Sequence, residues 1–137
     1  MDSSKIPVIF ILDKNQIHNS LIKYHLNVNR FSNVHAFASG NECLYRIEKS
    51  LQPDFIVMDY DTGDYNGFDF IKLVNTLSPD TKIIFFSSIN EPLLAVRLLD
   101  AGATDYVAKT GKLEIGITEL VKNLGFLIRE EIHFKIN

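Results

Sequence analysis

The sequence predicts a single doubly wound α/β domain, in which five parallel strands carry helices on both faces of the sheet. Two observations lead to this fold class. The 137 residues alternate five times between a short apolar run and a segment with helical spacing. The apolar runs are continuous, which is typical of parallel strands buried on both faces. The hydrophobic content of 46% suits one domain over residues 1–137, with its core at about 5–130.

The first half of the chain contains three predicted strands and two predicted helices. Four apolar residues with helical spacing mark the first helix: Ile17, Leu21, Tyr24 and Val28. A capping box from Ser39 to Glu42 opens the second helix, and Pro53 follows its end. The predicted strands are residues 7–12, 33–37 and 55–58, and the predicted helices are residues 17–28 and 39–51.

The second half continues the same alternation. Residues 61–67 are rich in Gly, Asp and Asn, which predicts a loop after the third strand. Asn90 is placed to cap the fourth helix, Pro92 lies in its first turn and Gly102 follows its end. The remaining predicted strands are residues 82–86 and 104–108, and the remaining helices are residues 68–77 and 113–134.

Polar residues stand where four of the apolar runs stop: Asp13, Asp59, Ser87 and Lys109. The carboxyl ends of parallel strands meet at one edge of the sheet, where α/β proteins bind ligands. Each residue alone has an ordinary explanation, since Asp commonly forms turns or caps helices and Lys is usually solvated. The coincidence of all four at one predicted edge indicates a shared site suited to phosphoryl chemistry.

Composition restricts the function classes. A net charge of -3 argues against nucleic-acid binding by charge alone, because that function favours a basic face. Cys43 is the only cysteine, so an intrachain disulfide is excluded and a cytoplasmic location is expected. The apolar runs are too short for a membrane span, and we expect no membrane partner. The histidines lack metal-ligand spacing and are interpreted as surface or internally paired residues: His18, His25, His35 and His133.

At these positions the sequence resembles the receiver domain of bacterial two-component response regulators. The matching segments end in Asp13, Asp59 and Lys109 or contain Asn66-Gly67 and Ser87-Ser88, and residues 101–103 also match. The resemblance covers about residues 5–130. It implies a flavodoxin-like sheet in the order 2-1-3-4-5.

The resemblance also implies a role for each polar strand end. Asp59 would accept a phosphoryl group from a histidine kinase or a histidine phosphotransfer domain, and the domain would catalyse this step and a slow dephosphorylation. Lys109 would contact a phosphate oxygen, and Ser87 would donate its hydroxyl to the phosphoryl group. The resemblance implies a Mg²⁺ cofactor, held by Asp13, Asp59 and the backbone carbonyl of Asp61.

Tyr106 matches the family's aromatic switch position. Its ring would turn inward when Ser87 is drawn toward the phosphate, and this would change the face made by the fourth helix, the fifth strand and the last helix. A downstream effector protein or domain would bind that face. The last helix is long for a receiver, and its apolar residues are interpreted as packing inward, as a homodimer contact or as a lead into an effector segment.

The sequence departs from the family pattern beside the first strand. Receivers usually carry two adjacent acids there, whereas this chain has Asp13 and then Lys14. Like charges ~4 Å apart repel by about 4 kcal/mol at an effective dielectric of about 20, so we expect weakened Mg²⁺ binding unless Lys14 swings out to solvent. Alternatively, the Lys14 ammonium replaces part of the metal's charge. Thr62-Gly63 and Thr110 also depart from the pattern, which usually has Met-Pro and Pro there.

Three function classes remain open. The first is a phosphorylatable receiver. The second is a pseudo-receiver that binds partners without phosphorylation, as Lys14 favours. The third is an aspartyl-phosphate phosphatase, because Asp59-Tyr60-Asp61 is similar to the double-Asp motif of haloacid-dehalogenase-type enzymes. An FMN-binding flavodoxin is disfavoured, because residues 13–18 lack a Ser/Thr/Gly-rich phosphate loop.

Overall fold

Strands and helices alternate throughout the part of the chain that the structure describes. The structure is a computed structural model and describes residues 6–136, with the backbone alone for residues 131–136. Its elements are β1 (Val8–Leu12), α1 (Gln16–Val28), β2 (Asn33–Phe37), α2 (Gly40–Lys49), β3 (Phe55–Met58), α3 (Gly67–Leu77), β4 (Lys82–Ser87), α4 (Pro92–Asp100), β5 (Asp105–Ala108) and α5 (Leu113–Ile136). The five predicted strand-helix repeats are therefore confirmed.

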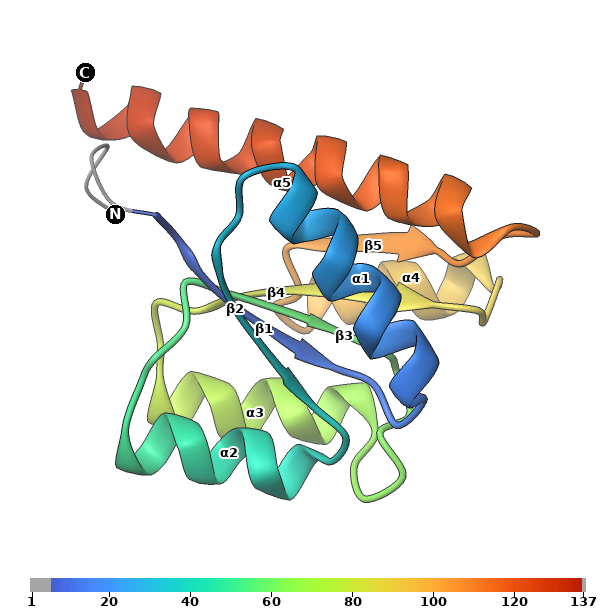
Figure 1. Cartoon of the computed structure of the whole chain (residues 1–137). Coiled ribbons are helices and arrows are strands. Elements are labelled where there is room, and N and C mark those ends of the chain that lie inside the picture. The colour runs from blue at the N-terminus through green and yellow to red at the C-terminus, as the bar shows by residue number, and fades with distance from the viewer. Residues whose placement is uncertain (1–5, 137) are drawn as a thin grey trace.

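The five strands form one parallel sheet in the order β2-β1-β3-β4-β5 (Figure 1). This is the order that the resemblance implied. The chain first moves outward from β1 to the β2 edge and then returns past β1 to β3. The point where the order reverses lies between β1 and β3, and there the carboxyl ends of both strands are open to a ligand.

Helices cover both faces of the sheet, as the continuous apolar strands predict. Helices α1 and α5 pack on one face, and α2, α3 and α4 pack on the other (Figure 1). Successive side chains of a strand point to opposite faces. In β1, Ile9 and Ile11 contact the first group of helices, whereas Phe10 and Leu12 contact the second.

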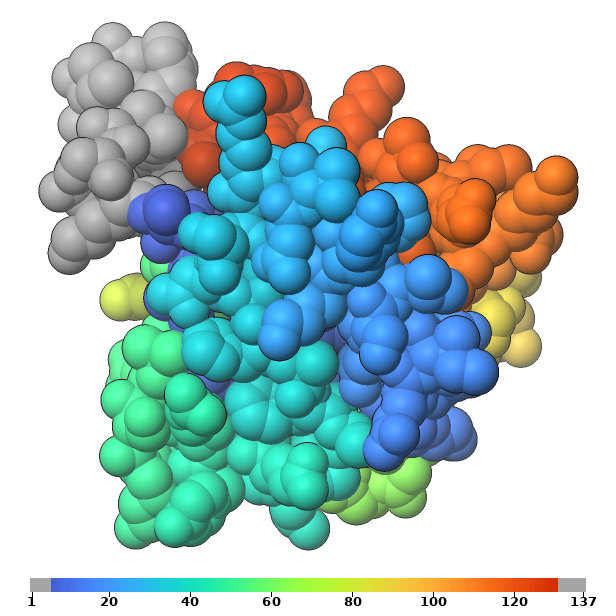
Figure 2. All heavy atoms as spheres, in the orientation of Figure 1, coloured from blue at the N-terminus to red at the C-terminus, as the bar shows by residue number. Residues whose placement is uncertain are grey.

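Three of the four apolar residues that predict α1 face solvent, and only Leu21 packs against the core. Ile17, Tyr24 and Val28 are 71%, 62% and 63% exposed, while the helix buries Asn19, Ile22 and Leu26 toward the sheet. In the space-filling view the outward side of α1 forms part of the front surface (Figure 2). The spacing located the helix correctly, because both stripes repeat with the same period, but it did not select the buried face.

Two helix ends differ from the predictions. Glu91, and not Asn90, occupies the N-cap position of α4, and its side chain makes no capping hydrogen bond. Pro92 begins the helix, where a backbone N–H would have no acceptor within the helix, so its missing N–H leaves no hydrogen bond unmade. The last helix continues to Ile136, two residues past the predicted end. The side chains of His133 and of residues 131–137 lie outside the described residues.

None of the helices in the described part of the chain is both long enough and apolar enough to cross a membrane.

Candidate functional site

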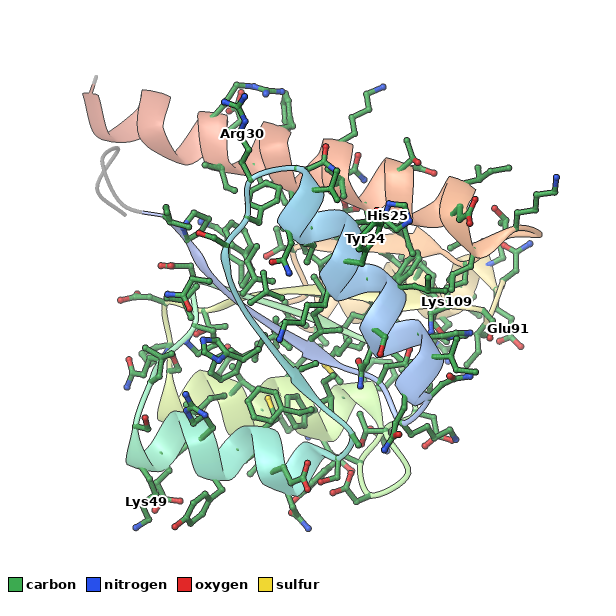
Figure 3. The ribbon with its side chains drawn as sticks, viewed as in Figure 1. Tyr24, His25, Arg30, Lys49, Glu91 and Lys109 are labelled. Carbon is green, nitrogen blue, oxygen red and sulfur yellow. The ribbon has the colours of Figure 1, made fainter. Side chains whose placement is uncertain are left out.

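The four polar strand ends meet at one edge of the sheet. Lys109 Nζ donates to Asp13 Oδ2 at 2.5 Å and to Asp59 Oδ2 at 3.2 Å, and Ser87 Oγ donates to Asp59 Oδ1 at 2.6 Å. Figure 3 shows Lys109 at the end of the molecule where α1 begins, with Glu91 at the same end. The predicted convergence of these side chains is thus present in the fold.

Asp59 is the accessible carboxylate of the cluster. Its side chain is 18% exposed, whereas the Asp13 side chain is 3% exposed. The Asp59 backbone N–H donates to the carbonyl of Leu12, and Tyr60 N–H donates back to Asp59 Oδ1 at 2.7 Å. One carboxylate oxygen therefore accepts two neutral donors, and the other faces the Lys109 ammonium.

Asp13 is fixed by the turn between β1 and α1. Its Oδ1 accepts from Asn15 N at 2.8 Å, and Asn15 in turn caps α1 by accepting from the backbone of Ile17 and His18. The buried amide of Asn19 donates to the carbonyl of Asp13 at 2.7 Å. Such caps fix the first turn of a helix. The Asp13 carboxylate is therefore held in one direction, toward Lys109.

Lys14 points away from this cluster. Its Nζ lies 3.3 Å from Asp61 Oδ2, and the two side chains are 55% and 62% exposed. The N–H of Gly63 donates to Asp61 Oδ1, and this bond, followed by the Lys14 ammonium, lowers the pKa of Asp61. The sequence predicts weakened Mg²⁺ binding unless Lys14 turns to solvent. In the structure Lys14 does turn to solvent.

The site offers Mg²⁺ fewer oxygen ligands than a receiver with two adjacent acids after β1 would offer. Among the described residues, no three His, Cys, Asp or Glu side chains are grouped so that they could hold a metal. The carboxylates of Asp13 and Asp59 nevertheless share the Lys109 cation, so both point at one position. Mg²⁺ commonly takes one or two carboxylates and keeps several waters. Two carboxylates that point at one position therefore suit a Mg²⁺ ion by their donor chemistry.

The loop after β3 is clamped to the start of α2, which the sequence did not predict. Asp64 Oδ1 accepts from Gly40 N at 2.9 Å and Thr62 Oγ at 2.8 Å, and Asp64 Oδ2 accepts from Asn41 N at 2.9 Å. The Tyr65 hydroxyl donates to Asn41 Oδ1 at 2.6 Å. A carboxylate at a helix N-terminus satisfies free N–H groups there. In the sequence, Asp64 looked like an ordinary residue of a polar loop.

Tyr106 contacts the loop between β4 and α4. Its ring stacks on Phe85 with centroids 6.3 Å apart, and its hydroxyl donates to the carbonyl of Ile89 at 2.5 Å. Burial raises the pKa of Tyr106, the contact with Ser87 opposes this, and the charges of Asp59 and Glu91 raise it further. Ser87 Oγ accepts from the Ile89 N–H at 3.3 Å, so Tyr106 and Ser87 both contact the Ile89 backbone.

His18 also belongs to the cluster, although the sequence placed it only among surface or internally paired histidines. Its Nδ1 lies 3.1 Å from Lys109 Nζ and 3.7 Å from Asp13 Oδ2. The one available signal is its place in the first turn of the helix that follows Asp13. Because many residues at such positions point to solvent, the spacing alone could not select it.

Comparison with known proteins agrees with this geometry. Residues 9–121 match the family model described as the response regulator receiver domain. A protein-glutamate methylesterase/protein-glutamine glutaminase from Geobacter sulfurreducens is 30% identical over 96% of this chain and 33% of its own length. The chemotaxis protein CheY of Thermotoga maritima is 32% identical over 52% of this chain and 58% of its own length. The chain thus spans only part of the length of these relatives.

Solved structures show the same fold. The receiver domain of a LuxO repressor protein from Vibrio parahaemolyticus superposes with a TM-score of 0.82 at 19% identity, over 96% of this chain and 97% of that domain. A CheY-like receiver protein from Methanospirillum hungatei superposes with a TM-score of 0.80 at 21% identity, over 94% of this chain and 98% of that protein. Because the family model covers residues 9–121, well over half of the chain, this protein belongs to the response regulator receiver domain family.

Proposed function

We propose that this receiver domain, acting as one unit over residues 1–137, accepts a phosphoryl group on Asp59 from a histidine kinase or a histidine phosphotransfer domain. A carboxylate oxygen of Asp59 attacks phosphorus, and the bond from phosphorus to the donor histidine nitrogen breaks. The observation that carries the proposal is the position of Asp59: partly exposed, with the Ser87 hydroxyl on one oxygen and the Lys109 ammonium facing the other.

The residues around Asp59 act by electrostatic stabilisation. Phosphoryl transfer relies on positioning and on neutralising charge on the phosphate oxygens. Lys109 supplies a positive charge and Ser87 a hydroxyl donor at the acceptor carboxylate. A Mg²⁺ ion held by Asp13, Asp59 and the Asp61 carbonyl would add positive charge to the phosphate oxygens. Lys14 supplies no carboxylate to this ion, so the binding is weaker than an acid pair would give, although the outward position of Lys14 keeps its charge away from the site.

Tyr106 and the face formed by α4, β5 and α5 are the proposed output. Ser87 Oγ accepts from the Ile89 N–H at 3.3 Å and the Tyr106 hydroxyl donates to the Ile89 carbonyl, so a change in the Ser87 hydrogen bond would reach Tyr106 through Ile89. Large apolar side chains on α4 are open to a partner: Leu93, Val96 and Leu99. We propose an effector protein or domain, or a second copy of this chain, as the partner, and no direct contact with nucleic acid or membrane.

We propose a cytoplasmic location, because the single cysteine forms no disulfide within the chain and so requires no oxidising compartment. Cys43 is fully buried, and burial raises its pKa to about 12. A buried thiol of this kind is unreactive, because the thiolate is the reactive form. The residue therefore packs into the core from the buried side of α2.

A pseudo-receiver is the second candidate, and one observation favours it. Lys14 stands where the family carries a metal-binding acid, and Asp61 pairs with it. In this case the domain binds its partner in one state, and Asp59 is never modified. The aspartyl-phosphate phosphatase has no comparable support, because its double-Asp motif would stand on the third strand and not on the first.

Phosphorylation of the purified chain separates these candidates. We expect incubation with phosphoramidate and Mg²⁺ to add one phosphoryl group by intact-mass analysis, and Asp59→Asn to abolish the addition. Ser88→Ala serves as the control for Ser87→Ala, which should slow the reaction. An unmodified wild-type chain that also gives no Tyr106 resonance change with beryllofluoride would support the pseudo-receiver. Steady turnover of a generic phosphate ester would instead indicate a phosphatase.

A further inference from the structure

The ammonium group of Lys109 is bound on three sides. Nζ lies 2.5 Å from Asp13 Oδ2, 3.1 Å from His18 Nδ1 and 3.2 Å from Asp59 Oδ2. An ammonium carries three N–H donors and no acceptor. All three donors are taken, and the Lys109 side chain is only 5% exposed. Any new acceptor that reaches this ammonium must therefore displace one of the three present partners.

His18 is held beside Lys109 by the first turn of α1. Its backbone N–H donates to the Asn15 side chain at 3.2 Å, and Asn15 is tied to Asp13 through its own N–H. The ammonium can only donate, so His18 Nδ1 must accept, and the neutral ring then carries its proton on Nε2. The His18 side chain is 31% exposed, so its outer side reaches solvent while Nδ1 faces the cluster.

We propose that His18 is a positioning residue that holds the Lys109 ammonium on the Asp13 side of the site in the unphosphorylated protein. The distances support an off-centre ammonium, since Lys109 Nζ lies 0.7 Å nearer to Asp13 Oδ2 (2.5 Å) than to Asp59 Oδ2 (3.2 Å). His18 lies on the same side, 3.7 Å from Asp13 Oδ2. This inference rests on the proposed phosphorylation of Asp59.

A phosphoryl group on Asp59 brings new oxygens that compete for the Lys109 N–H groups. His18 is the partner that gives way, because it is the only neutral acceptor and charged acceptors form stronger hydrogen bonds. A contact present only before phosphorylation stabilises the unphosphorylated state selectively. His18 therefore lowers the steady-state level of phosphorylation and sets how strongly the domain responds to its phosphodonor.

Three variants test this role. His18→Leu removes the acceptor and keeps a good helix former, whereas His18→Asn places an amide oxygen the same number of bonds from the backbone as Nδ1. His25→Leu on the same helix is the matched control. With phosphoramidate, we expect the ratio of phosphorylated to unphosphorylated chain to rise about fivefold in His18→Leu and to stay near the wild-type value in the other two variants.

A second measurement does not depend on phosphorylation. Nitrogen-detected NMR of the Lys109 ammonium in the unphosphorylated chain should show faster proton exchange in His18→Leu and wild-type exchange in His18→Asn. Equal behaviour of all variants, or equal change in His18→Leu and His18→Asn, would overturn the positioning role. If the wild-type chain accepts no phosphoryl group, the proposed function fails, and the exchange rates still decide whether His18 holds Lys109.

Discussion

Lys14 and Asp61 form an ion pair on the solvent side of the site, with Nζ 3.3 Å from Oδ2. Both side chains are more than half exposed, so the pair itself adds little stability. The pair matters because it changes which charges lie near Asp13 and Asp59. The ammonium is drawn away from Asp13 and Asp59, and the carboxylate of Asp61 is engaged by a cation. The site consequently keeps the carboxylates of Asp13 and Asp59, both bound to Lys109, and lacks the second acid of the family's adjacent pair.

Replacing Lys14 by Asp should strengthen metal binding. The change removes a positive charge and restores the second acid, and we expect the Kd for Mg²⁺ to fall about tenfold in an NMR titration of the site resonances. Lys72→Asp on α3 makes the same change of charge on an exposed helix position away from the cluster. An equal effect of both variants would show that only net charge matters. Wild-type affinity in Lys14→Asp would show that Lys14 does not limit Mg²⁺ binding.

Replacing Asp64 by Asn should loosen the loop that follows the phosphoacceptor strand. The amide side chain of the Asp64→Asn variant would keep one acceptor oxygen, whereas the wild-type carboxylate accepts from Gly40, Thr62 and Asn41. Because Asp64 acts as a cap at an exposed site, we expect a loss of about 1 kcal/mol in the free energy of unfolding, measured by urea titration at neutral pH. Asp80→Asn, in the exposed turn before β4, should leave stability unchanged.

The stability that Asp64 contributes should depend on pH in a defined direction. Partial burial raises its pKa, but hydrogen bonds from the backbone of Asn41, the hydroxyl of Thr62 and the backbone of Gly40 outweigh this and lower the pKa below 3.8. A lowered pKa in the folded state means that the contribution is complete above the ordinary value and is lost as the pH falls through the folded value. The difference between wild type and Asp64→Asn should therefore shrink in acid. A pH-independent difference would contradict the capping role.

Tyr106→Phe should remove the bond to the Ile89 carbonyl and cost about 1 kcal/mol of stability. The pKa of Tyr106 is raised above 10.0, chiefly by burial, so the folded state favours the neutral phenol. The contribution to stability is complete below the ordinary value and is lost as the pH rises through the folded value. Phenolate absorbance should show one late-titrating component that Tyr106→Phe lacks. Its persistence in the variant would assign the signal to another tyrosine.

Gly67→Ala should destabilise the protein where α3 begins. A methyl group at this position would lie 2.7 Å from Cε1 of the buried Phe85 ring and 3.0 Å from Tyr60. Forced overpacking of this kind costs about 1–3 kcal/mol. Gly125→Ala in α5 is the matched comparison, because the nearest atom, Arg129 Nη1, is 3.7 Å away. There we expect a gain of about 0.5–1 kcal/mol from the lower entropy of the unfolded chain, again by urea unfolding. A stable Gly67→Ala variant would mean that Phe85 can move.

The sequence by itself determined the elements and the edge at which the site lies. Continuous apolar runs specify parallel buried strands, and the strand-helix order places the residues that follow them at one edge. Asp13, Asp59, Ser87 and Lys109 could thus be named together, because the direction of parallel strands brings their carboxyl ends to one side of the sheet whatever the details of packing.

Tertiary structure alone decided which partners those residues have. Two apolar stripes on α1 repeat with the period of the helix. Packing against α5 and the sheet buries the stripe with Ile22 and Leu26 and leaves Ile17 and Tyr24 exposed. The outward turn of Lys14, the clamp by Asp64 and the contact of His18 with Lys109 link residues far apart in the chain. Such contacts depend on distances set by the whole fold, and a one-dimensional pattern does not contain them.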